Sequence, residues 1–399
     1  MSDEARRPSQ KASLGLILLL GVMTATPPVS VDIYLPAVPA IIRHFDSTEA
    51  QAGLALSGFL LGLAAGQLVY GSWSDRVGRR LPILAGFGLY ILATLGCIFA
   101  PNIGALVGFR FLQAFGGCAG VVVSRAVVRD RFNHDEMLQV FSLLMPVTGI
   151  GPIFAPLLGA FILTCGDWRL EFWFLLCFGL LCWFGTLLFL RESRHPDDAA
   201  LSRGEHPFAS YLALLRERRV VGYILAGTMS QAALFAYLAE GPPLLIDVYG
   251  LSPQSYGWIF AMNGAGLIAC SQINRRVVKW LEAKEILRRT SYVALAAALV
   301  LIVCATTGFG GLPGILAPLF VIVASMGFTQ PNGLSGAMSV DPLRSGSTSA
   351  LYGATQFAIG GVSASIAAAL HDGTPRPMAM VILIALGVAA LSMRALLKD

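Results

Sequence analysis

Long apolar stretches separated by short polar connections run through the whole chain. Twelve of them are bounded by charged or turn-forming residues: 12–41, 49–72, 81–100, 103–124, 138–164, 168–190, 220–247, 253–272, 290–308, 312–337, 346–370 and 376–396. A helix of about 20 apolar residues crosses the ~30 Å hydrocarbon core of a bilayer. The apolar runs are continuous and do not alternate with polar residues, which argues against a membrane β-barrel. The pattern predicts an all-α integral membrane protein with twelve transmembrane helices.

The composition supports a membrane protein without a separate soluble domain. Hydrophobic residues make up 56% of the 399 residues and charged residues 13%, which is about half the charged share of an ordinary soluble domain. The longest polar stretch, 191–219, holds only 29 residues. Basic residues precede the first apolar run, and in this respect the segment resembles a signal peptide. Because the apolar character continues to Ile42, we interpret the run as the first span.

Lysine and arginine are distributed unevenly between the two ends of the predicted spans. With an even number of spans both termini lie on one side, and that side receives 24 of the 28 basic residues. The positive-inside rule therefore predicts that both termini and the loop 191–219 are cytoplasmic. This loop divides the chain into an N-terminal six-helix half, 1–190, and a C-terminal six-helix half, 220–399. Two such halves around a central cavity are typical of secondary transporters.

Other classes of function lack the residues that their chemistry requires. The seven cysteines include no C-x-x-C pair, and all but Cys165 lie inside apolar runs, so we expect neither a disulfide framework nor a metal site. The histidines are scattered over loops and helix ends, which disfavours a membrane enzyme. No Gly-Lys pair is available for a phosphate-binding loop. The net charge of +5 comes from basic residues clustered in the loops on one side of the predicted spans, so it does not indicate nucleic-acid binding. No cofactor is expected.

One acidic residue, Asp32, lies inside the first span. A carboxylate in hydrocarbon is costly, so such a residue faces a cavity, pairs with a cation or stays protonated. Prolines at positions 27, 28, 36 and 39 are expected to kink the helix and leave it irregular around the acid. We predict that Asp32 carries a proton. The alternative is a structural ion pair or cap at the outer helix end.

Arg110 in the fourth span and Glu240 in the seventh are further charges predicted to act in proton coupling. Asp32 and Arg110 each lie about 8 residues, or ~12 Å, below the outer surface. We therefore predict that they interact directly or through water, with a pair that only holds the fold as the alternative. Glu240 is buried if its span continues to Asp247, and interfacial if the span ends at the adjacent prolines.

The most specific pattern is the connection 71–80, GSWSDRVGRR. Gly71 and Gly78 permit a sharp turn, Asp75 can cap the start of the next helix, and the basic side chains attract anionic lipid headgroups. A loop that only sets topology does not need this order of glycine, acid and arginine. We predict a gating loop formed by Gly71, Asp75, Arg76, Gly78, Arg79 and Arg80.

Small and helix-breaking residues mark two spans. In the fifth span they recur every three or four residues and form one helical face: Pro146, Gly149, Pro152, Pro156 and Gly159. In the second span, glycines at positions 58, 62 and 66 form a similar stripe. Such stripes are typical of close helix packing, and a sliding contact in a moving transporter requires the same smooth surface.

Polar and aromatic residues in the spans can line a central cavity. Tyr34 and Tyr237 are favoured because each lies within one turn of an intramembrane acid, and Gln113 and Asn263 are predicted with them. Further candidates share this character: Gln231, Gln330, Asn332, Gln356, Phe59, Tyr256, Trp258 and Phe357. Any one of these can instead face lipid.

These patterns together resemble the major facilitator superfamily. The connection 71–80 resembles its signature loop between spans two and three, and Arg110-x-x-Gln113-x-x-Gly116 resembles its motif in span four. Gly151-Pro152 with Gly159 resembles the antiporter motif of span five. Alanines at positions 114 and 160 replace glycines of the usual patterns.

The first span points to one branch of that superfamily. Asp32-Ile33-Tyr34-Leu35-Pro36 resembles the first span of twelve-span drug:proton antiporters, in particular the bicyclomycin-resistance (Bcr/CflA) branch. The resemblance implies proton-driven export of drugs or other lipophilic small molecules across the bacterial inner membrane by alternating access. It also implies that the gating loop holds the halves together on the cytoplasmic side, that Arg110 assists proton coupling and that Asp32 handles protons or cations.

The expected partners are a drug-like small molecule, protons and membrane lipids. No obligate protein partner is evident, and a monomer is expected. The alternative function is proton-coupled uptake or export of a small polar metabolite. Its cavity would require several charged or hydrogen-bonding residues, and the few intramembrane charges favour lipophilic cargo.

Overall fold

The computed structural model describes residues 14–131, 154–193, 207–341 and 344–397, and in these ranges it contains helices and no strand. The first part of the chain forms α1 (Leu14–Thr24), α2 (Thr26–Asp32), α3 (Val38–Phe45), α4 (Glu49–Val77), α5 (Arg80–Ile98), α6 (Ile103–Arg131) and α8 (Arg169–Phe189). The second part forms α10 (Pro207–Arg216), α11 (Arg218–Pro242), α12 (Pro253–Val277), α13 (Ala283–Thr307), α14 (Gly311–Val340), α15 (Ser345–Ala369) and α16 (Arg376–Leu396).

Many of these helices have the length and apolar character of membrane spans. Within the described residues, eight pass this test, or nine if the bent pair Gly15–Thr24 and Thr26–Phe45 forms one span. The helices α12 and α15 have 25 residues each but are less apolar. Of the predicted fifth span, 138–164, only the helix Phe154–Cys165 lies within the described residues. The prediction of an all-α protein with many membrane spans is confirmed.

Prolines break the first span into short pieces, as predicted. The axis bends by 46° between α1 and the segment that follows it. The helix α2 has prolines in its first turn and ends at Asp32, and the short 3-10 helix η1 (Leu35–Ala37) comes after it. A proline lacks the backbone N–H and clashes with the preceding turn, so it starts or interrupts a helix. The acid therefore lies at a break in the span.

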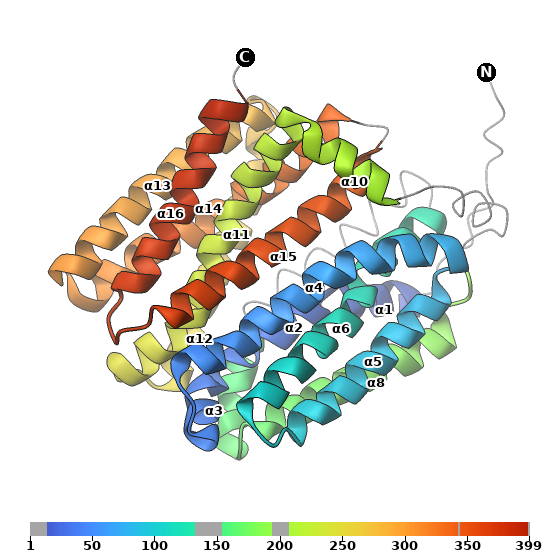
Figure 1. The fold of residues 1–399 in the computed structure, drawn as a ribbon, viewed down its shortest axis with the longest axis horizontal. Helices are drawn as coiled ribbons and strands as arrows, with labels where there is room; N and C mark the ends of the chain where they lie inside the picture. The colour runs from blue at the N-terminus through green and yellow to red at the C-terminus, as the bar shows by residue number, and fades with distance from the viewer. Residues whose placement is uncertain (1–13, 132–153, 194–206, 342–343, 398–399) are drawn as a thin grey trace.

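The helices form two groups that meet along α4 and α15 (Figure 1). In the first group α4, α5, α6 and α8 pack on one another, and in the second α11, α13, α14 and α16 do so. Small residues let α4 and α15 approach closely. A Cβ atom on Gly53 would lie 2.4 Å from the Cβ of Ala368, and one on Gly361 would lie 3.2 Å from the carbonyl oxygen of Ser57.

The glycine stripe of the second span lies against α6. A Cβ atom on Gly62 would lie 2.2 Å from the carbonyl oxygen of Phe111, and one on Gly66 would lie 2.5 Å from the Cβ of Cys118. Backbone and small side chains are therefore in direct contact. For this stripe the interpretation as close helix packing is confirmed.

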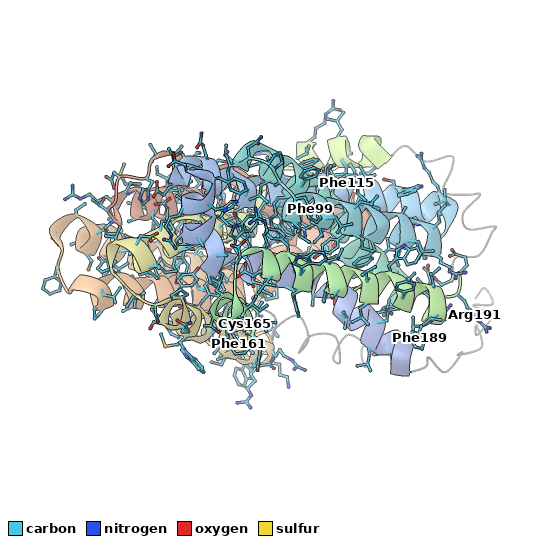
Figure 2. The ribbon with its side chains drawn as sticks, turned by 90° about the horizontal axis from the view of Figure 1, so that it is seen from below. Phe99, Phe115, Phe161, Cys165, Phe189 and Arg191 are labelled. Carbon is cyan, nitrogen blue, oxygen red and sulfur yellow. The ribbon has the colours of Figure 1, made fainter. Side chains whose placement is uncertain are left out.

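Large apolar side chains project from the outside of the bundle (Figure 2). Phe99 is 71% exposed and Phe161 is 63% exposed. Trp258, one of the candidate cavity residues, is also exposed at the surface. A water-soluble protein rarely presents so much apolar surface, whereas hydrocarbon accepts it.

Part of the predicted linker 191–219 is helical. The helix α10 packs against α11 and α15, and residues 194–206 lie outside the described part of the chain. The expectation of a continuous loop is therefore wrong for Pro207–Arg216.

Candidate functional site

A cavity of about 320 Å³ lies among helices from both groups. Its wall is mainly apolar and is contributed by α2, α4, α11, α12, α14 and α15: Pro27, Pro28, Val31, Leu63, Leu234, Phe235, Leu238, Phe260, Leu267, Val323, Met326 and Phe357. A few polar side chains interrupt this wall: Asp32, Gln231, Asn263, Gln330 and Gln356. A mostly apolar hollow with a few placed polar groups is the usual form of a small-molecule site. No residue of α6 lines the cavity, so the prediction that Gln113 lines it is wrong.

Asp32 is the acidic residue in the cavity wall. It ends α2 and is almost fully buried. In the described part of the chain, no hydrogen bond or ion pair links its carboxylate to another side chain. Its position at the helix break leaves the carboxyl group facing the hollow, where a substrate or a proton can reach it.

Amide side chains form the other polar feature of the wall. The Nε2 of Gln330 in α14 donates a hydrogen bond of 2.7 Å to the Oε1 of Gln231 in α11. The Nδ2 of Asn263 in α12 donates one of 3.1 Å to the hydroxyl of Tyr237. Tyr237 is thus buried directly behind a wall residue. Amide groups held in this way present fixed donors and acceptors to a bound molecule.

Arg110 is fully buried in a separate pocket beside the cavity. Its guanidinium donates hydrogen bonds to the Oε1 of Gln113 (2.7 Å) and to the backbone carbonyl of Ser30 (3.1 Å). The guanidinium carbon lies 4.2 Å from the ring centre of Phe59 and 4.7 Å from that of Tyr34. Cation–π contacts of this kind stabilise a buried cation.

The predicted direct contact between Asp32 and Arg110 is absent. The two residues were matched in depth, but depth does not fix the direction in which each side chain leaves its helix. Arg110 points into the aromatic pocket and Asp32 into the cavity. Tyr34 and Gln113, which were predicted for the cavity, lie in the pocket of Arg110.

A buried acid that the sequence reading missed lies near Arg110. Glu171, in the first turn of α8, is 1% exposed. It interacts electrostatically with Arg110, but neither carboxylate oxygen has a hydrogen-bond partner among the described residues. The sequence does show an acid inside the apolar run 168–190. Because this acid lies close to the polar residues at the start of the run, it was not recognised as buried.

Glu240 is buried near the end of α11, because the helical chain continues past it. The π-helix η2 (Pro243–Val248) extends α11, so the helical chain continues past the prolines to Val248. The Oε2 of Glu240 lies 2.6 Å from the Nδ1 of His371, in the connection between α15 and α16. This hydrogen bond raises the pKa of His371 above its ordinary value, against the opposing effect of burial. His371 was read only as a loop residue, since nothing in the sequence places it beside α11.

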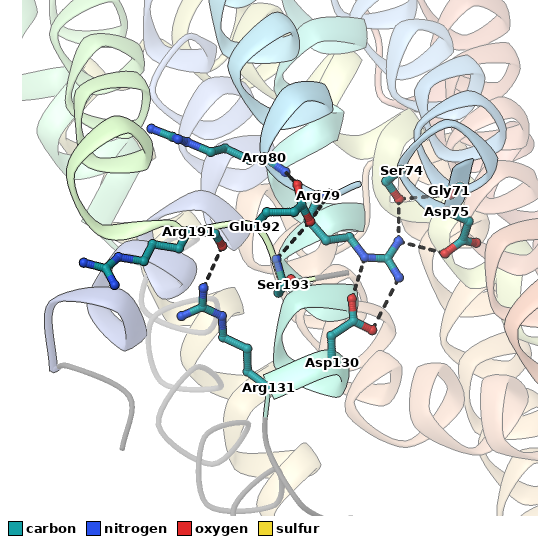
Figure 3. A network of polar contacts seen from close by, with 10 residues as sticks. All are labelled: Gly71, Ser74, Asp75, Arg79, Arg80, Asp130, Arg131, Arg191, Glu192 and Ser193. Atoms are coloured by element: carbon teal, nitrogen blue, oxygen red, sulfur yellow. Dashed lines mark hydrogen bonds and ion pairs between the residues drawn. The ribbon is translucent and has the colours of Figure 1, made fainter. Parts of the chain in front are cut away.

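Arg79 is the centre of the polar network at the end of α4 (Figure 3). Its guanidinium binds Asp130 of α6 (2.6 Å), Asp75 (2.7 Å) and the hydroxyl of Ser74 (2.9 Å). Burial alone lowers the pKa of Arg79, but the hydrogen bonds with Asp130 and Asp75 raise it above its ordinary value. The guanidinium therefore remains charged and ties the connection to α6.

Two roles expected within this connection are wrong. Asp75 does not cap α5; it lies in the last turn of α4 and binds Arg79. Gly71 lies inside α4 and makes no turn, because the helix extends beyond the apolar run to Val77. Arg76 also belongs to the last turn of α4, and Arg80 begins α5.

Gly78 makes the turn and Glu192 caps the next helix. Gly78 has φ 99° and ψ 174°, a conformation essentially restricted to glycine. Glu192 accepts hydrogen bonds from the backbone N–H groups of Arg79 (2.8 Å) and Arg80 (3.1 Å). These are among the unpaired donors that every helix start presents. A residue from the segment after α8 therefore completes the connection.

The antiporter-like motif of span five falls only partly within the described residues. Gly149, Gly151 and Pro152 lie outside them. Gly159 packs on the broken first span, where a Cβ atom would lie 2.2 Å from the carbonyl oxygen of Ile33. The carbonyl oxygen of Pro156 faces Gly257 of α12. The helix Phe154–Cys165 thus contacts the first span beside Asp32 and also α12. Across the described ranges, no group of three or more His, Cys, Asp or Glu residues could hold a metal ion.

Comparison with known proteins gives consistent matches over most of the chain. The family model described as Major Facilitator Superfamily matches residues 18–365. The "Uncharacterized MFS-type transporter YdgK" of Bacillus subtilis is 32% identical over 98% of both chains. The "Bicyclomycin resistance protein homolog" of Haemophilus influenzae is 30% identical over 92% of both chains. The "Multidrug resistance protein MdtL" of Escherichia coli is 27% identical over 82% of both chains.

Solved structures share the fold at low sequence identity. A D-xylose-proton symporter superposes with a TM-score of 0.72 and 15% identity over 96% of both chains. The xylose transporter XylE of E. coli, in a partially occluded inward-open conformation, gives a TM-score of 0.74 and 14% identity over 96% of this chain and 97% of the other. At such identities the similarity shows the fold alone.

Proposed function

The chain belongs to the Major Facilitator Superfamily, and from this premise we propose that it exports drugs or other lipophilic small molecules across the bacterial inner membrane in exchange for protons. As a transporter of this family it is not an enzyme. The proposal includes an orientation in which both termini and the Arg79 network face the cytoplasm. That orientation rests on the excess of lysine and arginine at this end of the predicted spans.

The observation that carries the proposal is a carboxylate, that of Asp32, which has no partner among the described residues and lies in a predominantly apolar cavity. The apolar wall suits a lipophilic molecule, because burial of apolar surface drives its binding. The amides of Gln231, Asn263 and Gln330 supply a few directed hydrogen bonds. Asp32 supplies the titratable group. The scarcity of charge in the wall favours lipophilic cargo over a small polar metabolite. Relatives named for bicyclomycin resistance and multidrug resistance support the same cargo.

Alternating access in this proposal is a movement of residues 1–190 against residues 220–399. Asp32 belongs to the first half and the cavity amides to the second, so the movement changes the surroundings of the carboxylate. The Arg79 network braces α4, α6 and the segment after α8 within the first half. Asp75 also interacts electrostatically with Tyr211 of α10, which connects the network to the linker. The cavity forms within one chain, so we take a monomer as the transport unit.

The proposal is tested in inside-out membrane vesicles with an acidified interior. Ethidium uptake and the decay of the pH gradient are recorded for the wild type, Asp32→Asn and the control Asp46→Asn. Asp46 has φ 47° at a helix end, a conformation that asparagine tolerates. The wild type and Asp46→Asn are expected to accumulate ethidium and release protons, and Asp32→Asn to lose both.

Two results would contradict parts of this proposal. Ethidium movement that ignores the gradient in the wild type would exclude proton-driven export of this compound. Normal coupled transport in Asp32→Asn would move the proton site to another acid, with Glu240 and its partner His371 the next residues to examine.

A further inference from the structure

A second set of unsatisfied polar groups lies outside the cavity, around Arg110. Within the described part of the chain, both carboxylate oxygens of Glu171, the Nε of Arg110 and the hydroxyl of Tyr34 are buried and lack a hydrogen-bond partner. Buried polar groups almost always find a partner. Three such groups close together therefore indicate a site whose hydrogen bonding changes during function.

The three groups surround one aromatic cage. Phe172 follows Glu171 in α8, and its ring centre lies 5.8 Å from the guanidinium carbon of Arg110 and 6.1 Å from the ring centre of Tyr34. The titratable and charged groups that face this cage come from three further elements: Arg110 of α6, Tyr34 after α2, and Tyr90 and Cys97 of α5. Arg110 is the cation among them.

The order of the groups along the membrane normal follows from the helices. The helices α6 and α8 begin at the same end of the bundle, since the Nε of Arg169 donates a hydrogen bond to the carbonyl of Ile98 at the end of α5. At 1.5 Å per residue, Glu171 lies about 3 Å and Arg110 about 10 Å from the start of its helix. Long helical side chains lean toward the helix start, so Arg110 extends toward Glu171.

Arg110 also reaches the element that carries Asp32. Its Nη2 donates to the carbonyl of Ser30, two residues before that acid in α2. In this arrangement the charge of Arg110 acts on Glu171 in the cage, and the guanidinium contacts the helix that carries Asp32 only through a backbone carbonyl. A buried charge without a compensating partner is strongly disfavoured. With a single cation, the neutral arrangement has one ionised and one protonated carboxyl group.

We propose that Glu171 is a second proton-binding residue of the transporter and that Arg110 pairs with whichever of Glu171 and Asp32 is ionised. This inference rests on the proposed proton-driven export. A proton from the outer side binds the carboxylate of Glu171, and Arg110 then turns toward Asp32, which releases its own proton into the cavity. Transfer of the proton from Glu171 to Asp32, with Arg110 turning back to Glu171, restores the starting state, so that each cycle carries one proton from the outer side to the cavity. No bond other than those to the proton is made or broken.

The test compares Glu171→Gln with Glu282→Gln, which changes an exposed glutamate before α13. Gradient-driven ethidium accumulation and ethidium exchange at equal pH on both sides are measured in the same vesicles. Glu171→Gln is expected to keep exchange but to lose about tenfold in the accumulation supported by a gradient of about one pH unit, since each coupled proton contributes that factor. The pH dependence of its exchange should also flatten, and Glu171→Asp should restore part of the coupling.

The outcomes separate this inference from the proposed function. Wild-type protein that shows no gradient-driven accumulation would refute the function itself. Full coupling in Glu171→Gln, equal to the wild type and to Glu282→Gln, would refute only the role of Glu171. Loss of both accumulation and exchange in Glu171→Gln and in Glu171→Asp would assign the residue a structural role and also overturn the inference.

Discussion

Replacing Gly78 by alanine should destabilise the protein through two separate effects. The backbone at φ 99° and ψ 174° is strained for any residue with a Cβ atom, at a cost of about 1–3 kcal/mol. The new Cβ would also lie 2.5 Å from the Oε2 of Glu192, so this side chain must move away from the N–H groups of Arg79 and Arg80. A hydrogen bond to a charged group contributes about 1.5–3 kcal/mol. Together these effects predict a loss of about 2.5–6 kcal/mol.

The two effects are separated by a double-mutant cycle with Glu192→Ala. The three atoms nearest to the added Cβ of residue 78 belong to the side chain of Glu192, so the variant without this side chain keeps the backbone strain and loses these close contacts. Gly78→Ala should then cost only about 1–3 kcal/mol in that background. The free energy of unfolding is measured by titration with a denaturing detergent in mixed micelles, with tryptophan fluorescence as the signal.

Gly71→Ala is the matched control within the same motif. Gly71 lies inside α4, and the nearest atom to an added Cβ is 4.0 Å away. Alanine should therefore stabilise the helix by about 0.5–1 kcal/mol. If Gly78→Ala is as stable as the wild type, or if both substitutions have the same effect, the assignment of the turn to Gly78 and of the cap to Glu192 is refuted.

Two further predictions concern the second group of helices. The raised pKa of His371 means that its pairing with Glu240 contributes fully to stability below the ordinary histidine pKa of 6.5 and is lost as the pH rises through the higher folded-state value. From mildly acidic to alkaline pH, the unfolding temperature of the wild type should therefore fall more than that of His371→Gln. Parallel plots of unfolding temperature against pH for the two proteins would contradict this prediction. Gln231→Leu or Gln330→Leu should each cost about 1–3 kcal/mol, because the remaining amide loses its partner in an apolar wall. The double variant should be more stable than either single one, and additive losses measured by the same detergent titration would exclude the pairing.

Features that depend on one stretch of chain could be predicted from the sequence. The prolines around Asp32 predicted a broken first span, because their effect on a helix is local. The glycine stripe of span two predicted close packing from its helical spacing. The apolar runs predicted the helical membrane fold. In each case the physical cause lies within about twenty neighbouring residues.

Features that depend on distant residues could not be predicted in this way. The depth of Arg110 followed from residue counting, but its direction depends on Phe59, Tyr34 and Gln113, which belong to different elements. Glu192 and His371 lie far along the chain from the helices that they complete, and their residue types are ordinary for loops. Gly71 was misread because the apolar run ends before the helix does, so hydropathy marks the edge of the bilayer and not the end of α4.

The contact between α4 and α15 has a mechanical consequence. Where long side chains interlock, one helix can move past another only if several rotamers change together. Gly53 meets only the methyl group and backbone of Ala368, and Gly361 meets the backbone of Ser57 and the side chain of Leu61. The proposed movement of one half against the other therefore requires few rotamer changes where these small residues of α4 and α15 meet.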